Sequence, residues 1–171
     1  MRRLLLTMLF SIAMSCSAAE QPARRIELNI DKAVAPMDRF FVLSVGSDYP
    51  GTLSRKDSQA HLAAAAEELG FKYLRFHDLF HDALGTVRRV DGTIVYDWTR
   101  IDQLYDALLA KGVRPFVELG FTPSVLKTSD QSLFYWKANT SHPDPALWRD
   151  LVDAYLRHMI ARYGVDEVRS W

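Results

Sequence analysis

Residues 61–77 read HLAAAAEELGFKYLRFH, and they contain the end of one element and the start of the next. The alanine-rich half consists of strong helix formers and stops at Gly70, a residue type that commonly ends helices. Asp57-Ser58 precedes this helix as its predicted N-cap. Tyr73–His77 then alternates apolar and polar side chains in the manner of a β-strand. A helix followed at once by a strand predicts an α/β fold.

The same order recurs on both sides of this stretch, and it predicts a parallel sheet with helices on its outside. The predicted elements, in chain order, are a strand at Phe40–Val45, a helix at 57–69, a strand at Tyr73–His77, a helix ending at Lys111-Gly112, a strand at Arg114–Leu119, a helix at Pro145–Tyr163 and the start of a fourth strand at about Val168.

Two α/β architectures share this order, a doubly wound sheet and a (β/α)8 TIM barrel. Neither GxGxxG nor GxxxxGK[ST] occurs after any strand, so no nucleotide cofactor is expected. Long loops follow the predicted strands at their carboxyl ends, where barrel enzymes place their sites, and the loop over residues 121–144 is too long for a simple connector. We therefore expect a partial TIM barrel with about the first three βα units and the start of strand four.

The first forty residues differ from the rest. Residues 1–19 have a basic start, a short apolar run from Leu4 and a small-residue cleavage site, which predicts a signal peptide and a secreted or periplasmic protein. Lipidation at Cys16 is the alternative. Residues 20–39 form an accessory segment whose alternation over Arg25–Asp31 predicts a short strand, and residues 40–171 form the first half of the barrel domain.

Charge and composition limit the kinds of partner that the protein is expected to bind. Acidic and basic residues balance at 21 each, so no field of one sign attracts nucleic acid or an anionic membrane, and a neutral substrate such as a carbohydrate fits this balance. The one cysteine, Cys16, lies in the signal peptide, which excludes a disulfide or a cysteine-ligated metal in the mature chain.

The candidate site lies at the ends of the second and third strands. Alternation puts Arg75 and His77 on the polar face of strand two, and Glu118 on the corresponding face of strand three. In a barrel this face points inward, so the three side chains are predicted to meet in a binding site. The alternative is a structural ion pair with a core histidine.

Two further patterns allow competing interpretations. His77 and His81, with Asp78 and Asp82 beside them, have the spacing of a helical metal site, but this spacing loses its meaning if a strand ends at His77. The long loop carries aromatic residues that either stack on sugar rings or pin the loop to the barrel rim: Phe121, Phe134, Tyr135 and Trp136.

At these residues the sequence resembles glycoside hydrolase family 39, which contains β-xylosidases and α-L-iduronidases. The resemblance runs from about Phe41 to Trp171, and the Tyr135-Trp136-Lys137 stretch is more similar to the xylosidase branch. The stretches that carry it are Tyr73–His77, Arg114–Pro123, Phe134–Asn139 and Arg162–Trp171.

The resemblance implies a retaining mechanism with two glutamates about 5 Å apart. It places both beyond Trp171, so this chain is expected to be an inactive fragment with no catalytic residue of its own. It also implies a set of sugar-binding residues: Arg75, His77, Glu118, Phe121 and Trp136. The alternatives are a sugar-binding remnant without catalysis and a metal-dependent barrel hydrolase.

Overall fold

A computed structural model describes residues 24–29, 31–32, 35–36 and 38–171. The chain divides into two units, residues 1–37 and 38–171, each taken here by itself. The predicted signal peptide, with Cys16, lies outside the described residues. The strand predicted at Arg25–Asp31 is wrong, because residues 24–29 and 31–32 have no strand and their side chains are exposed. Alternation produces a strand only where a neighbouring strand satisfies the backbone, and none does so among the described residues.

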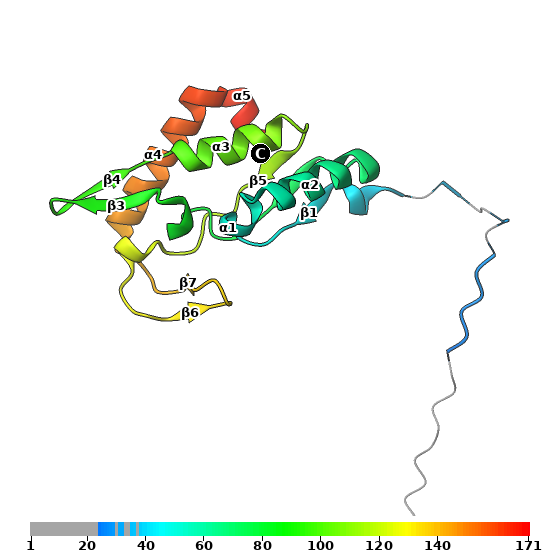
Figure 1. The fold of residues 1–171 in the computed structure, drawn as a ribbon, viewed down its shortest axis with the longest axis horizontal. Coiled ribbons are helices and arrows are strands. Elements are labelled where there is room, and N and C mark those ends of the chain that lie inside the picture. Colours follow the sequence, from blue (N-terminus) through cyan, green and yellow to red (C-terminus); the bar gives the residue numbers. More distant parts are fainter. Residues whose placement is uncertain (1–23, 30, 33–34, 37) are drawn as a thin grey trace, which may run out of the picture. The chain divides into compact units, whose positions relative to one another are not determined.

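The second unit is built on a parallel sheet, as predicted. Its strands are β1 (Ser44–Gly46), β2 (Tyr73–Arg75) and β5 (Arg114–Phe116), in the order β1-β2-β5. Helices connect successive strands, namely α1 (Pro50–Leu53) with α2 (Lys56–Leu69), and then α3 (Thr99–Leu109) (Figure 1). Parallel crossovers are right-handed, so an order without reversal puts these helices on one face of the sheet.

The two faces of the sheet differ in burial. Val45, Leu74 and Pro115 stand opposite one another and face the core, and Leu74 is 2% exposed. Arg75 and Phe116 belong to the next row, on the open face. This confirms the alternation predicted for strand two. The core beneath the helices contains fully buried side chains of α3 and of α4 (Pro145–Tyr163), among them Ile101, Tyr105, Leu108, Leu151, Tyr155 and Met159.

The predicted end of α2 is confirmed, whereas its predicted N-cap is wrong. Gly70 ends α2 in the left-handed conformation at φ 75°, and its N–H donates to Ala66. The predicted cap at Asp57-Ser58 is wrong, because Arg55 is the N-cap and makes no side-chain cap. Asp57 instead lies in the first turn and pairs with Arg55 at 2.6 Å. Helix α4 (Pro145–Tyr163) is capped by the Asp144 carboxylate.

The predicted strands are shortened or replaced. Residues 40–42 form the 3-10 turn η1 (Phe40–Val42), and Phe40 is 77% exposed, so only Ser44 and Val45 of the strand predicted at Phe40–Val45 belong to a strand, β1. Strands two and three end at Arg75 and Phe116, which leaves His77 and Glu118 just beyond their carboxyl ends.

The predicted fourth strand is also absent from the described residues. The short helix α5 (Val165–Val168) occupies its place. Asp166 and Glu167 in its first turn favour a helix N-terminus, and Glu167 pairs with Arg114 at 2.8 Å. Trp171 then packs edge-on against Tyr105.

Two hairpins occur where the sequence analysis predicted loops. β3 (Val87–Val90) and β4 (Thr93–Tyr96) pair around Asp91-Gly92, which have φ values of 48° and 81° as a type I′ turn requires. Within the long loop, β6 (Ser132–Leu133) pairs with β7 (Ala138–Asn139). Two 3-10 turns complete the elements, η2 (Asp82–Leu84) and η3 (Ser124–Leu126). In the described part of the chain, none of the helices has the length and apolar character needed to cross a bilayer.

Candidate functional site

Three polar side chains meet at the carboxyl ends of β2 and β5, as the sequence predicted. The Glu118 carboxylate lies 2.5 Å from Arg75 Nη2 through Oε2 and 2.9 Å from His77 Nδ1 through Oε1. The Glu118 side chain is 25% exposed, and those of Arg75 and His77 are 49% and 30% exposed. The group is therefore packed together yet open on one side to an incoming molecule.

The hydrogen bonds determine which atoms remain for a ligand. An ionised carboxylate only accepts, so His77 Nδ1–H donates to Glu118, and His77 Nε2 is left to exchange a hydrogen bond with a ligand hydroxyl. Glu118 Oε1 is taken by His77, whereas the buried Oε2 lies in an ion pair with Arg75 Nη2 but has no well-directed hydrogen bond among the described residues. In this arrangement Glu118 orients Arg75 and His77 and keeps little freedom to act as a nucleophile.

The loop after β1 completes this side of the site. His77 N–H donates to Asp48 C=O at 3.2 Å, which extends the pairing of the two strands into their loops. The Asp48 carboxylate accepts hydrogen bonds from the Thr52 and Tyr135 hydroxyls. Burial acts to raise the pKa of Asp48, but these hydrogen bonds outweigh it and hold the pKa below its usual range. An ionised Asp48 thus ties the first loop to the tip of the long loop.

Trp136 is the centre of an aromatic cluster beside His77. Its ring stacks on Tyr49 at 5.2 Å and on Phe134 at 4.9 Å between centroids, and it lies 6.4 Å from the His77 ring. Trp136 is only 7% exposed. Since little of its ring surface is free, its burial favours the interpretation that it pins the loop, and its contact with sugar stays a prediction.

The neighbouring aromatic side chains are more open. Phe134 is 55% exposed and Tyr135 is 74% exposed, and the Phe134 ring also stacks over His77 at 5.9 Å. Phe121 touches Phe134 and Trp136 edge-on at 6.1 and 5.9 Å. Phe134 therefore keeps more of its ring exposed beside the polar group than Trp136 does, and an exposed aromatic ring can stack on a sugar.

The histidine and aspartates after His77 bind backbone groups of the long loop. His81 Nε2 lies 2.8 Å from the Trp136 carbonyl oxygen, while Nδ1 accepts from Ala83 N–H. The carboxylates of Asp78 and Asp82 accept the N–H groups of Phe121 and Ser124. We call these three side chains, Asp78, His81 and Asp82, the loop clamp. Since both His81 ring nitrogens are used, the alternative of a metal site at His77 and His81 is not supported.

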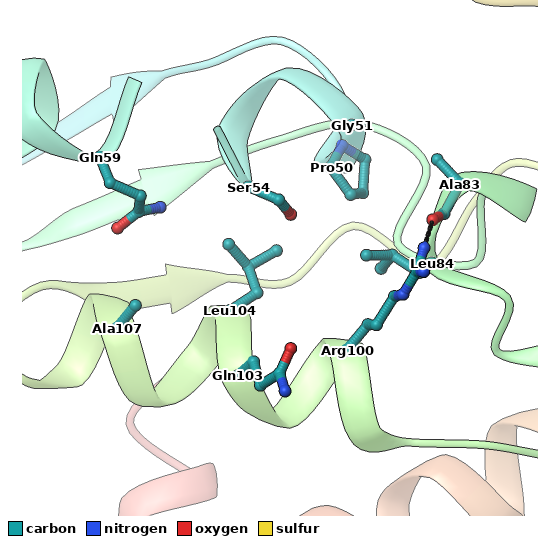
Figure 2. A pocket seen from close by; sticks show the side chains of 10 residues that line it. All are labelled: Pro50, Gly51, Ser54, Gln59, Ala83, Leu84, Arg100, Gln103, Leu104 and Ala107. Carbon is teal, nitrogen blue, oxygen red and sulfur yellow. Dashed lines mark hydrogen bonds between the residues drawn. The ribbon is translucent and has the colours of Figure 1, made fainter. Parts of the chain in front are cut away.

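A separate cavity of about 430 Å³ lies between α1, η2 and α3 (Figure 2). Leu104 lies in its middle, Ser54 and Gln103 border it, and Arg100 crosses its end to donate to the Ala83 carbonyl at 2.7 Å. None of the five predicted sugar-binding residues lines it. It is therefore distinct from the Arg75, His77 and Glu118 group.

Sequence reasoning did not find Asp48, Tyr49 or the role of Asp78. Asp48 and Tyr49 were seen only as part of a turn, although a polar residue just after a barrel strand is a signal for the site. Asp78 was considered only with a metal. Its positive φ of 57° is the conformation that puts it at the loop backbone, and no periodicity predicts that.

Comparison with known proteins places the chain in a family. The sequence profile of "Glycosyl hydrolases family 39" matches residues 24–171. A β-xylosidase of Geobacillus stearothermophilus is 43% identical over 132 residues, which cover 74% of this chain and 26% of that one. The crystal structure of a monomeric β-xylosidase from Caulobacter crescentus CB15 superposes with a TM-score of 0.77 at 67% identity, covering 83% of this chain and 29% of that one.

An α-L-iduronidase of Mus musculus is a more distant relative. It is 31% identical over 121 residues, which cover 67% of this chain and 17% of that one. The chain thus spans less than a third of the length of each of these relatives. The profile match spans all of the described residues, and the parallel sheet agrees with it. The chain belongs to glycosyl hydrolase family 39.

Proposed function

We propose that these residues supply the first βα units and part of the sugar-binding site of a retaining glycoside hydrolase that acts on β-xylosides. The identity to the two β-xylosidases, 43% and 67%, exceeds the 31% identity to the α-L-iduronidase, which supports the choice of sugar. The proposal includes a TIM barrel, to which the three-stranded parallel sheet contributes consecutive strands.

The observation that carries the proposal is the Glu118 bridge between Arg75 and His77 at the carboxyl ends of two neighbouring strands. It leaves His77 Nε2 and the half-exposed Arg75 guanidinium facing the open side of the sheet. A sugar presents hydroxyls that both accept and donate hydrogen bonds, so Arg75 would donate to one and His77 would orient another. Phe134 would cover the apolar face of the ring.

Catalysis itself is assigned to two glutamates other than Glu118. A retaining glycosidase needs a nucleophile and an acid/base about 5 Å apart. Glu118 is held in ion pairs with Arg75 and His77, which suits a positioning group better than a nucleophile or a proton donor. We therefore assign Glu118 to substrate positioning.

Export from the cytoplasm is a further part of the proposal. It is supported by the basic start and apolar run of residues 1–19. Fractionation of the cells that produce the protein, with N-terminal sequencing of the exported form, tests it. Export followed by cleavage near Glu20 is expected, and an uncleaved cytoplasmic product would contradict it.

The enzymatic proposal is tested on the protein that is produced when the whole reading frame is translated to its stop codon. Hydrolysis of aryl β-xyloside and aryl α-iduronide is measured for the wild type, for His77→Ala and for His61→Ala. His61 is an exposed histidine of α2 and is the matched control. We expect turnover of the xyloside, and a 10- to 1000-fold lower kcat/KM for His77→Ala only, since a hydrogen bond to a substrate hydroxyl that strengthens in the transition state contributes about 1.5–4 kcal/mol.

Two results would contradict the proposal. A folded protein that turns over neither glycoside would reject the activity while leaving the family membership intact. A His77→Ala variant with normal kinetics per folded molecule and a much lower Tm would reject the binding role and show that His77 is structural.

A further inference from the structure

Asp78 is a buried carboxyl group next to the sugar-binding residues. It is 2% exposed and follows His77 directly. Its Oδ1 accepts the backbone N–H of Phe121 at 2.9 Å, across a sequence separation of 43 residues. Removing a carboxyl group from water in this way is costly, and the cost is offset only where the group is hydrogen-bonded, paired or neutral.

The bond from Asp78 reaches the backbone three residues beyond Glu118. Glu118 must keep its distances of 2.5 and 2.9 Å to Arg75 and His77, and the Phe121 ring must keep its edge contacts with Phe134 and Trp136. The anchor on the Phe121 amide ties the end of the 118–121 segment to the loop after β2, while Thr122 ties the next residue to Asn139 and Ser141. The other two members of the loop clamp hold the long loop farther along, at Ser124 and Trp136.

We propose that Asp78 is a positioning residue, whose buried carboxyl holds the Phe121 backbone so that Glu118 and the Phe121 ring stay in place beside His77. This inference rests on the proposed function for its effect on catalysis. Asp78 is only 2% exposed, so we assign it no contact with the substrate.

The protonation of Asp78 adds a property that a simple anchor lacks. Burial raises its pKa to about 6, and the hydrogen bond from Phe121 opposes this only in part. The carboxyl lies at the wall of a cavity of about 270 Å³ that carries charges of both signs. The titratable and charged side chains that face it are Glu118, His81 and Asp82, with Lys127, Asp130 and Lys137 from the long loop.

Three variants separate the hydrogen bond from the charge and from the backbone conformation. Asp78 has φ 57°, which asparagine and glycine both tolerate. Asp78→Asn keeps an acceptor oxygen and removes the charge. Asp78→Gly removes the acceptor without straining the backbone. Asp153→Asn, on the exposed side of α4 in an ion pair with Arg157, is the matched control.

Kinetics on aryl β-xyloside and hydrogen exchange of the Phe121 amide are measured for each variant expressed to the stop codon. We expect Asp78→Gly to lower kcat/KM by about 10- to 100-fold, since small misplacements of positioned groups have effects of this size. We expect the kcat/KM of Asp78→Asn to stay within about threefold of the wild-type value at low pH, and its pH profile of kcat/KM to lack the ionisation near pH 6. We expect Asp153→Asn to change neither kcat/KM nor its pH profile.

The amide exchange makes the two possible failures distinguishable. If the wild type turns over no glycoside, the proposed function fails, while rapid exchange of the Phe121 amide in Asp78→Gly alone would still support the anchor. Wild-type kcat/KM in Asp78→Gly, or a Phe121 amide equally protected in all variants, would overturn the inference. So would identical pH profiles of the wild type and Asp78→Asn.

Discussion

Replacing Asp78 by asparagine should change how the stability of the protein depends on pH. Burial raises the pKa of this carboxyl from 3.8 to about 6. Between these two values the folded chain retains a proton that the unfolded chain has released, so the free energy of unfolding falls as the pH rises through this window. A difference of roughly 2 pKa units corresponds to about 3 kcal/mol. The side chain is 2% exposed, so solvent screens little of this effect.

Chemical denaturation of the wild type and Asp78→Asn at about pH 4 and about pH 7.5 measures the effect. At the lower pH both side chains are neutral in the folded protein, and Asp78 is only partly ionised in the unfolded chain, so we expect the unfolding free energies to agree within about 1 kcal/mol. At the higher pH we expect the asparagine variant to be more stable by up to about 3 kcal/mol.

Comparing the wild type with Asp78→Asn cancels the contributions that other titrating groups make to the pH dependence of stability. Glu167, whose pKa is held below its usual range by the Arg114 guanidinium, contributes stability that is lost as the pH falls, which is the opposite sign. Its contribution is common to both proteins and cancels in their difference. A stability difference that is the same at both pH values would refute the reasoning that burial costs the ionised Asp78.

Three further substitutions test the packing that supports the site, each by denaturation of the protein expressed to its stop codon. Leu108→Ala, at a fully buried position of α3, should cost about 2–5 kcal/mol, and a loss below about 1 kcal/mol would contradict its place in the core. Tyr105→Phe should cost about 1–3 kcal/mol, because it leaves the buried Tyr155 hydroxyl without its 3.0 Å partner, and the double variant with Tyr155→Phe should recover part of that loss. Trp136→Ala should speed amide hydrogen exchange in β6 and β7 while lowering the Tm of the whole protein only slightly. Unchanged exchange in these two strands would reject the pinning role.

Local patterns predicted the parts of the fold that depend on local chemistry. The helix end at Gly70 and the helix over Pro145–Tyr163 follow from glycine geometry and from capping by Asp144. The shared face of Arg75 and His77 follows from strand alternation. These features need no knowledge of distant residues, so a single sequence contains them.

The failures depend on partners far along the chain. Phe40–Val42 is as apolar as a strand, but pairing with β2 begins only at Ser44, so the run before it forms a turn. Residues 165–168 were expected to lead into a strand and form a helix, whose Glu167 binds Arg114 from β5. The hairpin at Asp91-Gly92 was the exception, because its turn signal was visible locally and was interpreted only as a loop.

In the candidate site, too, local pattern predicted some features and residues far along the chain determined others. Position on the strand predicted that Arg75, His77 and Glu118 would meet. The exposed area of the Trp136 ring depends on Tyr49 and Phe134, which pack against it from two different loops. Composition therefore did not predict that Phe134 would be more exposed than Trp136.

The loop clamp divides the long loop into a fixed base and an exchangeable tip. Its bonds hold the loop at Phe121, Ser124 and Trp136, whereas residues 129–135, which include the exposed Phe134 and Tyr135, lie between the last two anchors. Segments held at both ends by a rigid framework tolerate changes of sequence and length. Transplanting residues 129–134 from a relative, with Tyr135 kept because it bonds Asp48, would therefore show whether this tip sets which sugar the proposed site binds.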